Sequence, residues 1–192
     1  MSYRWYNSII LVAAAIIFFI LSENSQFISN KISSSEPNFR VIEREIQRGV
    51  DETEQYSQLL LEKSKKYGIG KVFKIYSDSI GSELSKKGVS IFLFRNNKLV
   101  FWSKNLDVID LKDDSTKLFI SSIQNAWYVG KWVSSKSDKV LALLLLKYDY
   151  PYQNKFLKNS YNQRFNELEG YSITNRKDND VRQLTLKDGT TI

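Results

Sequence analysis

The stretch KVLALLLLKYDYPYQNKFLKN, Lys139 to Asn159, decides the fold. Its apolar run, Val140 to Leu146, is far shorter than the roughly 20 residues that a helix needs to cross a bilayer. It is also too hydrophobic for a surface loop. An unbroken apolar run of this length is typical of a central strand that is covered on both faces. The chain then turns sharply, and Pro151 favours the start of a helix because its missing N–H costs nothing in a first turn.

The segments before this run predict the other strands of an antiparallel sheet. The pattern changes to a period of two, typical of strands, in GVSIFLFR (88–95) and KLVFWSK (98–104). Asn96-Asn97 lies between these two segments and suits a type I′ turn, because asparagine tolerates positive φ. AWYVGKWVSS (126–135) is a third strand and KVLALLLLKYDY (139–150) is a fourth.

Three further segments have weaker patterns. VIDLKDDSTKLFISSIQ (108–124) is interpreted as a loop with a short helix or turn, and PYQNKFLKNSYNQRFNE (151–167) as a helix that begins at Pro151. From Gly170 the chain is polar, with one possible hairpin in VRQLTLKDGTTI (181–192).

A long amphipathic helix is predicted ahead of the sheet, over 36–68, with Gly68 as its end, and a shorter helix over 71–87. Apolar and small residues recur on one side of the long helix with 3–4 spacing: Phe39, Ile42, Ile46, Gly49, Thr53, Tyr56 and Leu60. This stripe has two interpretations. It packs onto the chain's own sheet, or it forms the seam of a parallel homodimer.

The N-terminal segment predicts a membrane anchor. No charge occurs from Trp5 to Leu21, Trp5 and Tyr6 are residues typical of the membrane interface, and Arg4 precedes them. Arg4 would keep the amino terminus in the cytoplasm, so the rest of the chain is expected outside a bacterial inner membrane. The alternative is a cleaved signal peptide, but FFILSENSQ has bulky residues where a small-x-small cleavage site would lie.

The composition excludes several classes of chemistry. Cysteine and histidine are both absent, which removes disulfides, thiolate and imidazole metal ligands, Ser-His-Asp catalysis and phosphohistidine. The net charge of +7 comes from scattered basic residues without a dense block, so no nucleic-acid partner is expected. Asp113-Asp114 is a paired-carboxylate candidate that is better explained as a solvated loop, and Asp178 and Asp180 lack the further carboxylates and the glycine of a calcium loop. No cofactor, no metal and no catalytic residue are predicted, and an anchored hydrolase is disfavoured because no nucleophile–base pair is found.

The candidate ligand-binding residues are aromatic and basic side chains of the predicted strands: Arg95, Trp102, Trp127, Tyr128, Lys131 and Trp132. Strand aromatics are also ordinary core residues, so packing is the competing interpretation. A structural corner is predicted at Asp149, Tyr150 and Pro151, with Asp149 capping the helix that follows.

Three motifs, in this order, resemble the extracytoplasmic sensor region of Bacteroidetes-type two-component sensor histidine kinases. They are the hairpin with its VFWS return (100–103), the AWY strand start (126–128), where a glycine would be expected in place of Ala126, and the exit from Lys147 to Leu157. The resemblance covers roughly 1–169. It implies an α+β fold in which an N-terminal transmembrane helix leads to a long helix and then to a PAS-like or Cache-like antiparallel sheet with flanking helices.

The resemblance implies a division into a cytoplasmic tip and transmembrane helix (1–23), a linker (24–35), a stalk helix (36–68), a sensor domain (69–169) and an incomplete C-terminal part of that domain (170–192). It also implies a sensory input function, with an unknown ligand or periplasmic partner outside the membrane. Those kinases carry a phosphoacceptor histidine in a later segment, and this chain has no histidine, so no kinase activity is expected from it alone. A stand-alone anchored binding or assembly protein is the alternative.

Overall fold

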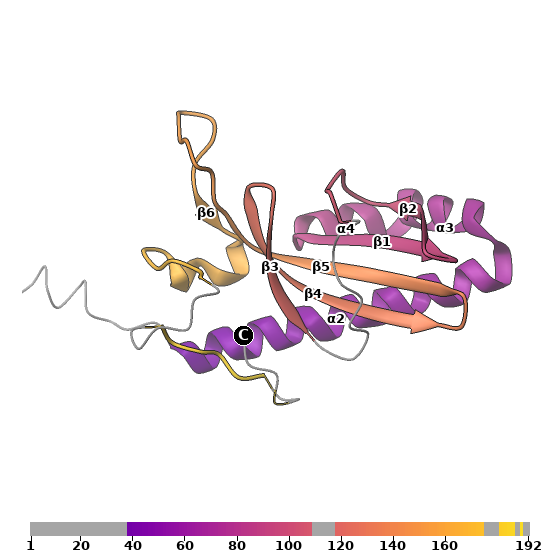
Figure 1. Cartoon of the computed structure of the whole chain (residues 1–192), viewed down its shortest axis with the longest axis horizontal. Helices are drawn as coiled ribbons and strands as arrows, with labels where there is room; N and C mark the ends of the chain where they lie inside the picture. Colours follow the sequence, from indigo (N-terminus) through magenta and orange to yellow (C-terminus); the bar gives the residue numbers. More distant parts are fainter. Residues whose placement is uncertain (1–37, 109–117, 175–180, 187–188, 190–192) are drawn as a thin grey trace, which may run out of the picture. The chain divides into compact units, whose positions relative to one another are not determined.

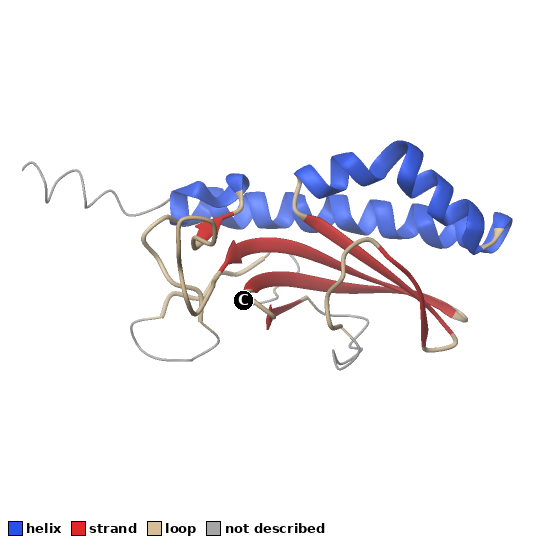
Figure 2. Ribbon diagram, turned by 90° about the horizontal axis from the view of Figure 1, so that it is seen from above, coloured by secondary structure: helices blue, strands red, loops and turns tan. Residues whose placement is uncertain are grey.

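A computed structural model describes residues 38–108, 118–174, 181–186 and 189 of the 192-residue chain. These residues form an α+β fold in which a six-stranded antiparallel sheet carries its helices on one face (Figures 1 and 2). None of the helices in these ranges combines the length and the hydrophobicity that a bilayer span requires. The predicted anchor, its linker, Asp113-Asp114, and the pair Asp178 and Asp180 all lie outside the described residues.

The predicted long helix is present as α2, Phe39–Tyr67. It ends at Gly68, whose φ of 79° is a conformation that glycine adopts without steric cost. The stripe predicted from the sequence faces the sheet, with Ile42, Ile46 and Leu60 fully buried. Packing of the stripe on the chain's own sheet is therefore confirmed, and the homodimer through this helix stays a prediction.

The predicted shorter helix is also present, but it is interrupted. It consists of α3 (Ile69–Ile75), the π-helical turn η1 (Tyr76–Ile80) and α4 (Gly81–Lys86). Val72 before the π turn and Leu84 after it are both fully buried, so the two flanking helices share one core.

The sheet contains β1 (Val89–Arg95), β2 (Lys98–Trp102), β3 (Phe119–Ile123), β4 (Ala126–Ser135), β5 (Asp138–Tyr148) and the short β6 (Ser160–Tyr161). The spatial order is β2-β1-β5-β4-β3, with β6 paired to the end of β5. The prediction of a central strand is confirmed, because β5 lies between β1 and β4 and is buried along its apolar run. Asn96 and Asn97 have φ of 49° and 60°, as a type I′ turn requires.

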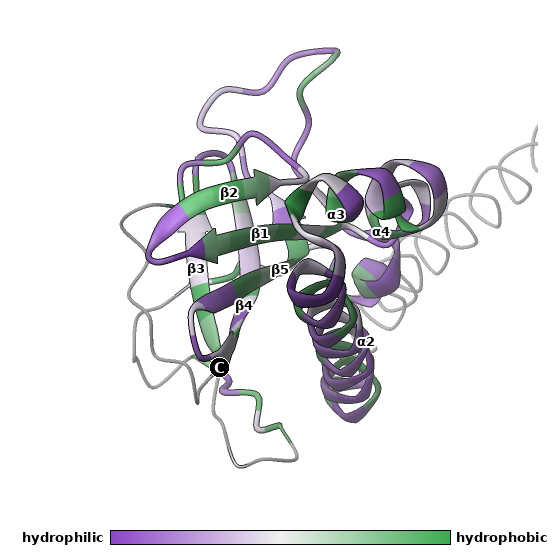
Figure 3. Cartoon of the chain, turned by 90° about the vertical axis from the view of Figure 1, so that its right-hand side faces the viewer, coloured by the Kyte–Doolittle hydropathy of each residue, from purple (hydrophilic) through white to green (hydrophobic). Residues whose placement is uncertain are grey.

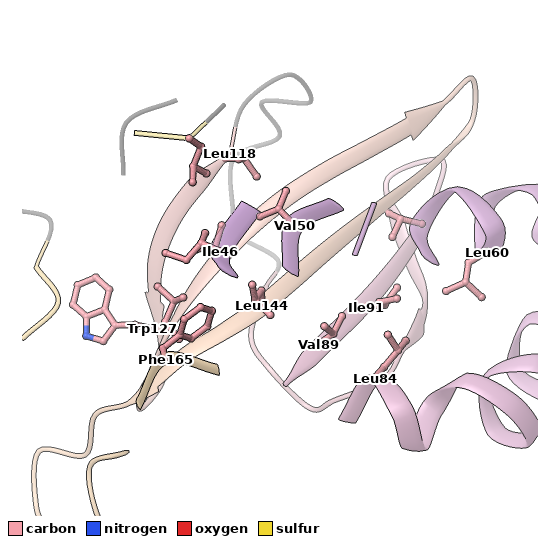
Figure 4. Packing of buried hydrophobic residues seen from close by; sticks show 14 of the residues in the cluster. Ile46, Val50, Leu60, Leu84, Val89, Ile91, Leu118, Trp127, Leu144 and Phe165 are labelled. Atoms are coloured by element: carbon pink, nitrogen blue, oxygen red, sulfur yellow. The ribbon is translucent and has the colours of Figure 1, made fainter. Parts of the chain in front are cut away.

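Each face of the sheet has its own apolar core. On the face toward the helices, Ile46 and Val50 of α2 pack with Leu144 of β5, while Leu84 packs near Val89 and Ile91 (Figure 4). Alternate residues of the same strands point to the other face and form a second cluster with Leu106 and Val108, which follow β2. Because residues of β1 pack into both clusters, this strand is hydrophobic along almost its whole length (Figure 3).

Two predictions for irregular segments are wrong. Phe119–Ile123 is a strand rather than a short helix or turn, because it pairs along its length with β4. Residues 151–159 form a loop rather than the first half of a helix, and β6 and the 3-10 helix η2 (Gln163–Leu168) follow it. Asparagine side chains bond to the backbone of this loop and compete with helical hydrogen bonding.

The C-terminal segment packs beside the start of α2. Leu186 is buried in the core on the helical face, and the Thr185 N–H donates to Glu43 Oε1 at 3.1 Å. Residues 181–186 form no strand beyond a bridge at Thr185, and the turn and return strand of the hairpin predicted over 181–192 lie outside the described residues, except Gly189.

Candidate functional site

A lysine surrounded by tyrosines lies on the sheet face opposite α2. Lys104 Nζ is 3.4 Å from Tyr128 Oη and 3.5 Å from Tyr148 Oη, distances at the upper limit of a hydrogen bond. The Tyr148 ring is stacked with that of Tyr150, with 6.0 Å between the ring centroids. We call Lys104, Tyr128, Tyr148 and Tyr150 the Lys104 site.

Among the described residues, aromatic rings rather than carboxylates contact the charged end of Lys104. Its Nζ lies 5.3 Å from the centroid of Tyr148 and 5.9 Å from that of Tyr128, which is within the range of a cation–π contact. No carboxylate in the described part of the chain is within ion-pair distance of Lys104. The ammonium group therefore keeps the capacity to pair with an anion from outside the chain.

Lys104 and Tyr128 each keep one protonation state around neutral pH. Burial acts to lower the pKa of Lys104, but the two tyrosine hydroxyls outweigh it and the pKa lies above the usual value of 10.5. Burial raises the pKa of Tyr128, although Lys104 opposes that shift. Lys104 is consequently a cation and Tyr128 a neutral phenol, so the site offers N–H and O–H donors to a ligand.

Two cavities adjoin the site, and Lys104 and Tyr148 line both of them. One, of about 180 Å³, extends toward Gln124 and Asn125. The other, of about 270 Å³, extends toward Tyr76, Ser85 and Ser90. These volumes are small for a binding pocket, so the site fits a small molecule or a single anionic group.

The local sequence explains how the site is assembled. Ser103 N–H donates to the Ile91 carbonyl at 2.9 Å, and Ser103 Oγ accepts from the Ile91 N–H at 2.8 Å. This pair of hydrogen bonds fixes the backbone immediately before Lys104. Lys104 follows β2, Tyr128 comes from β4, and Tyr148 is the last residue of β5, so three separate strands position the site.

Of the six residues predicted to bind a ligand, the structure brings only Tyr128 into this site. Trp132 lies on the same sheet face but packs against Phe94, with 5.3 Å between ring centroids. Trp127 lies on the helical face, where its Nε1–H donates to Asp149 Oδ2 at 3.2 Å.

The remaining three predicted residues are distant from one another. Arg95 forms two hydrogen bonds to the buried Asp138, at 2.9 and 2.7 Å, and Asp138 also accepts from Ser64 of α2 at 3.0 Å. Lys131 Nζ pairs with Glu54 of α2 at 2.6 Å. Trp102 ends β2 with 52% of its surface exposed.

The predicted corner at Asp149, Tyr150 and Pro151 is built by side chains and not by a helix cap. Asp149 accepts from Trp127 and also from Asn159 Nδ2 at 2.9 Å. The Tyr150 N–H donates to Asn159 Oδ1 at 2.7 Å. Asn159 therefore closes the base of the loop that Pro151 opens.

Sequence reasoning did not find Lys104 as a site residue and assigned Tyr148 no binding role. Lys104 is one lysine among many and follows the end of β2 by two residues, and only the pairing of β2, β1, β5 and β4 brings it near the two tyrosines. A usable signal was the concentration of tyrosines at 148 and 150, directly after the central strand.

The described residues contain no cluster of acidic side chains suited to a metal ion. The chain matches no protein-family model, and comparison with curated proteins and with solved structures gives no significant match.

Proposed function

We propose that this chain is the membrane-anchored, extracytoplasmic input domain of a two-component receptor, with a PAS-like or Cache-like fold, and that it binds a small anion at the Lys104 site. One observation carries the proposal. Lys104 is a cation that lines two cavities and has no carboxylate partner among the described residues. An anion there would gain charge-assisted hydrogen bonds from Lys104 and hydrogen bonds from the tyrosine hydroxyls.

The order of elements supports the sensory part of the proposal. A long helix follows the uncharged N-terminal segment and packs on an antiparallel sheet, which is the arrangement that the resemblance to sensor kinases implies. The ligand site lies on the opposite face of the same sheet from this helix.

The fold offers a route from the site to α2. Tyr148 belongs to β5, and β5 is the strand on which α2 packs most closely, at Gly49 and Leu144. A ligand that binds one arrangement of β5 more tightly than another shifts the population toward that arrangement. In this mechanism α2 follows β5 and transmits the change toward the membrane segment.

The first test is binding. Thermal unfolding of the purified full chain in detergent is measured with a panel of small carboxylates and phosphates. We expect at least one anion to raise the melting temperature, and the Lys104→Met variant to lose that increase. Lys98→Met is the matched control, because Lys98 is an exposed lysine at the start of β2. An identical response of both variants would remove the Lys104 site from the proposal.

The second test is signalling. The chain replaces the input region of a histidine kinase that drives a reporter, and the anion identified in the first test is added outside the cell. Reporter output that follows the anion, and that is lost with Lys104→Met, supports the input function. Anion binding without any effect on output would favour the stand-alone binding protein instead.

A further inference from the structure

The loop Pro151–Asn159, between β5 and β6, exposes apolar side chains on a backbone that is held in place. Tyr152 and Phe156 are 87% and 81% exposed, and Leu157 is 42% exposed. Figure 1 shows this loop, next to the β6 label, extending away from the sheet. We call Tyr152, Phe156 and Leu157 the loop patch.

Hydrogen bonds from polar side chains define the loop conformation. Asn154 Oδ1 accepts from the N–H groups of Phe156 and Leu157, at 2.8 and 2.9 Å. Gln153 Oε1 accepts from the Asn159 N–H at 3.0 Å, and Asn159 in turn binds the Tyr150 N–H. The polar side chains thus face the loop's own backbone, and the apolar ones face outward, which is the reverse of an ordinary surface loop.

The charge around the loop patch is positive. Between Asp149 and Glu167 the chain has no acidic residue, and Lys155 and Lys158 are both exposed in the loop. Lys155 Nζ lies 4.8 Å from the centroid of the Phe156 ring. Aromatic and aliphatic side chains bordered by lysines match the headgroup region of an anionic bilayer, where rings enter the interface and ammonium groups meet lipid phosphates.

The loop lies at the end of the sheet where α2 begins. Ser64, near the end of α2, contacts Asp138 at the start of β5, and Gly49 faces Leu144 further along, so the helix and the strand run in opposite directions. The start of α2 is therefore beside the end of β5, from which the loop emerges. Phe39 and Tyr161 line the same cavity at this end.

We propose that the loop patch inserts into the headgroup region of an anionic membrane. The inference rests on the proposed function to the extent that the uncharged segment 5–21, which precedes α2 in the chain, anchors the protein in that membrane. The contact would hold the start of α2 at a defined height above the bilayer, so that a movement of the helix is transmitted rather than lost by tilting.

The absence of cysteine from the chain allows a direct test. The full chain is reconstituted into vesicles of phosphatidylcholine and phosphatidylglycerol, with the fluorophore NBD attached at Phe156→Cys. Lipids that carry a nitroxide near the headgroup are expected to quench this probe and to shift its emission to the blue. Quenching should fall in vesicles of phosphatidylcholine alone and in the Lys155→Glu/Lys158→Glu variant. A probe at Lys98→Cys, on the β1–β2 hairpin, is the control and should remain unquenched.

A third probe separates this inference from the proposed function. NBD at Val12→Cys reports whether the N-terminal segment enters the bilayer. A quenched Val12 probe with an unquenched Phe156 probe overturns the loop inference and leaves the anchor intact. A quenched Phe156 probe with an unquenched Val12 probe supports the loop contact and rejects the anchor. Equal quenching at Phe156 and Lys98, or no quenching at either, overturns the loop inference, as would quenching that does not depend on phosphatidylglycerol.

Discussion

Gly49 of α2 lies so close to Leu144 of β5 that a Cβ atom at Gly49 would be 2.5 Å from Leu144 Cδ2. Real Cβ atoms essentially never show such a contact, and Leu144 is fully buried and has little room to move. The same Cβ would be 3.2 Å from Arg164 Nη1. The glycine in the predicted stripe is therefore what allows α2 to approach the central strand.

We predict that Gly49→Ala lowers the free energy of unfolding by about 1 kcal/mol, because overpacking outweighs the gain in helix propensity. Gly70→Ala is the matched control in α3, where an added Cβ meets nothing within 4 Å. It should raise stability by about 0.5 kcal/mol. Denaturant unfolding followed by circular dichroism measures both, and a Gly49→Ala protein as stable as Gly70→Ala would disprove the close packing.

The second prediction concerns Asp138, which is 1% exposed. The hydrogen bond from Arg95 lowers the pKa of Asp138, with help from Ser64 and Ser137 and against the effect of burial. A carboxyl whose folded pKa is depressed stabilises the fold above its unfolded value of about 3.9, and this stability is lost as the pH falls through the folded pKa. Stability should therefore drop as the pH falls below about 4.

Asp138→Asn should lower the free energy of unfolding by about 2–3 kcal/mol at neutral pH. This is less than the roughly 3–5 kcal/mol for a fully buried ion pair, because the Arg95 side chain is 35% exposed and water solvates its charge. The variant should also lose less stability on acidification than the parent. Asp51→Asn, at an exposed carboxylate of α2, is the control and should change the free energy of unfolding at neutral pH by less than about 0.5 kcal/mol. If the parent and Asp138→Asn lose the same stability as the pH falls, groups other than Asp138 cause the loss.

The third prediction concerns Asn159, which holds the base of the loop through Asp149 and Tyr150. Asn159→Ala should lower the free energy of unfolding by about 1 kcal/mol and make the Tyr150 amide exchange faster with solvent. Lys158→Ala, at the exposed neighbouring residue, is the control and should change neither the stability nor the exchange rate of the Tyr150 amide. Unchanged exchange at Tyr150 in Asn159→Ala would show that this hydrogen bond is not what orders the loop.

The fourth prediction is the pH dependence of anion binding. The pKa of Lys104 lies above 10.5 and the chain has no histidine, so the site does not change charge near neutrality. For a carboxylate, which is ionised throughout this range, the dissociation constant should stay level between about pH 6 and pH 9, as measured by calorimetry at constant ionic strength. A tenfold change, or about 1.4 kcal/mol, within that range would place the binding cation elsewhere.

Residues with a strong local preference could be read from the sequence. The unbroken run of β5, the Asn96-Asn97 turn and the end of α2 at Gly68 each follow from a property of the residues themselves. The stripe on α2 was equally clear, but periodicity cannot say whether a partner helix or the chain's own sheet covers it. The position of β5 opposite Gly49 shows that the chain's own sheet covers this part of the stripe, and a partner helix along the rest of α2 stays a prediction.

The other elements depend on contacts between distant residues. Ser121 and Ser122 interrupt the apolar pattern of β3, which owes its structure to pairing with β4. The segment after Pro151 has helical composition, yet Asn154 and Asn159 take over its backbone hydrogen bonds. The Lys104 site depends on the register of three strands, which no single stretch of sequence contains.

The π-helical turn Tyr76–Ile80 has a consequence for the evolution of the chain's length. A π turn holds one residue more than the α turn that it replaces. A deletion of one residue there closes a regular helix and leaves Val72 and Leu84 directed at the same core. In β1 or β5, by contrast, a single deletion moves every following side chain to the opposite face of the sheet. Homologous chains that differ by one residue in this region should therefore differ at this turn.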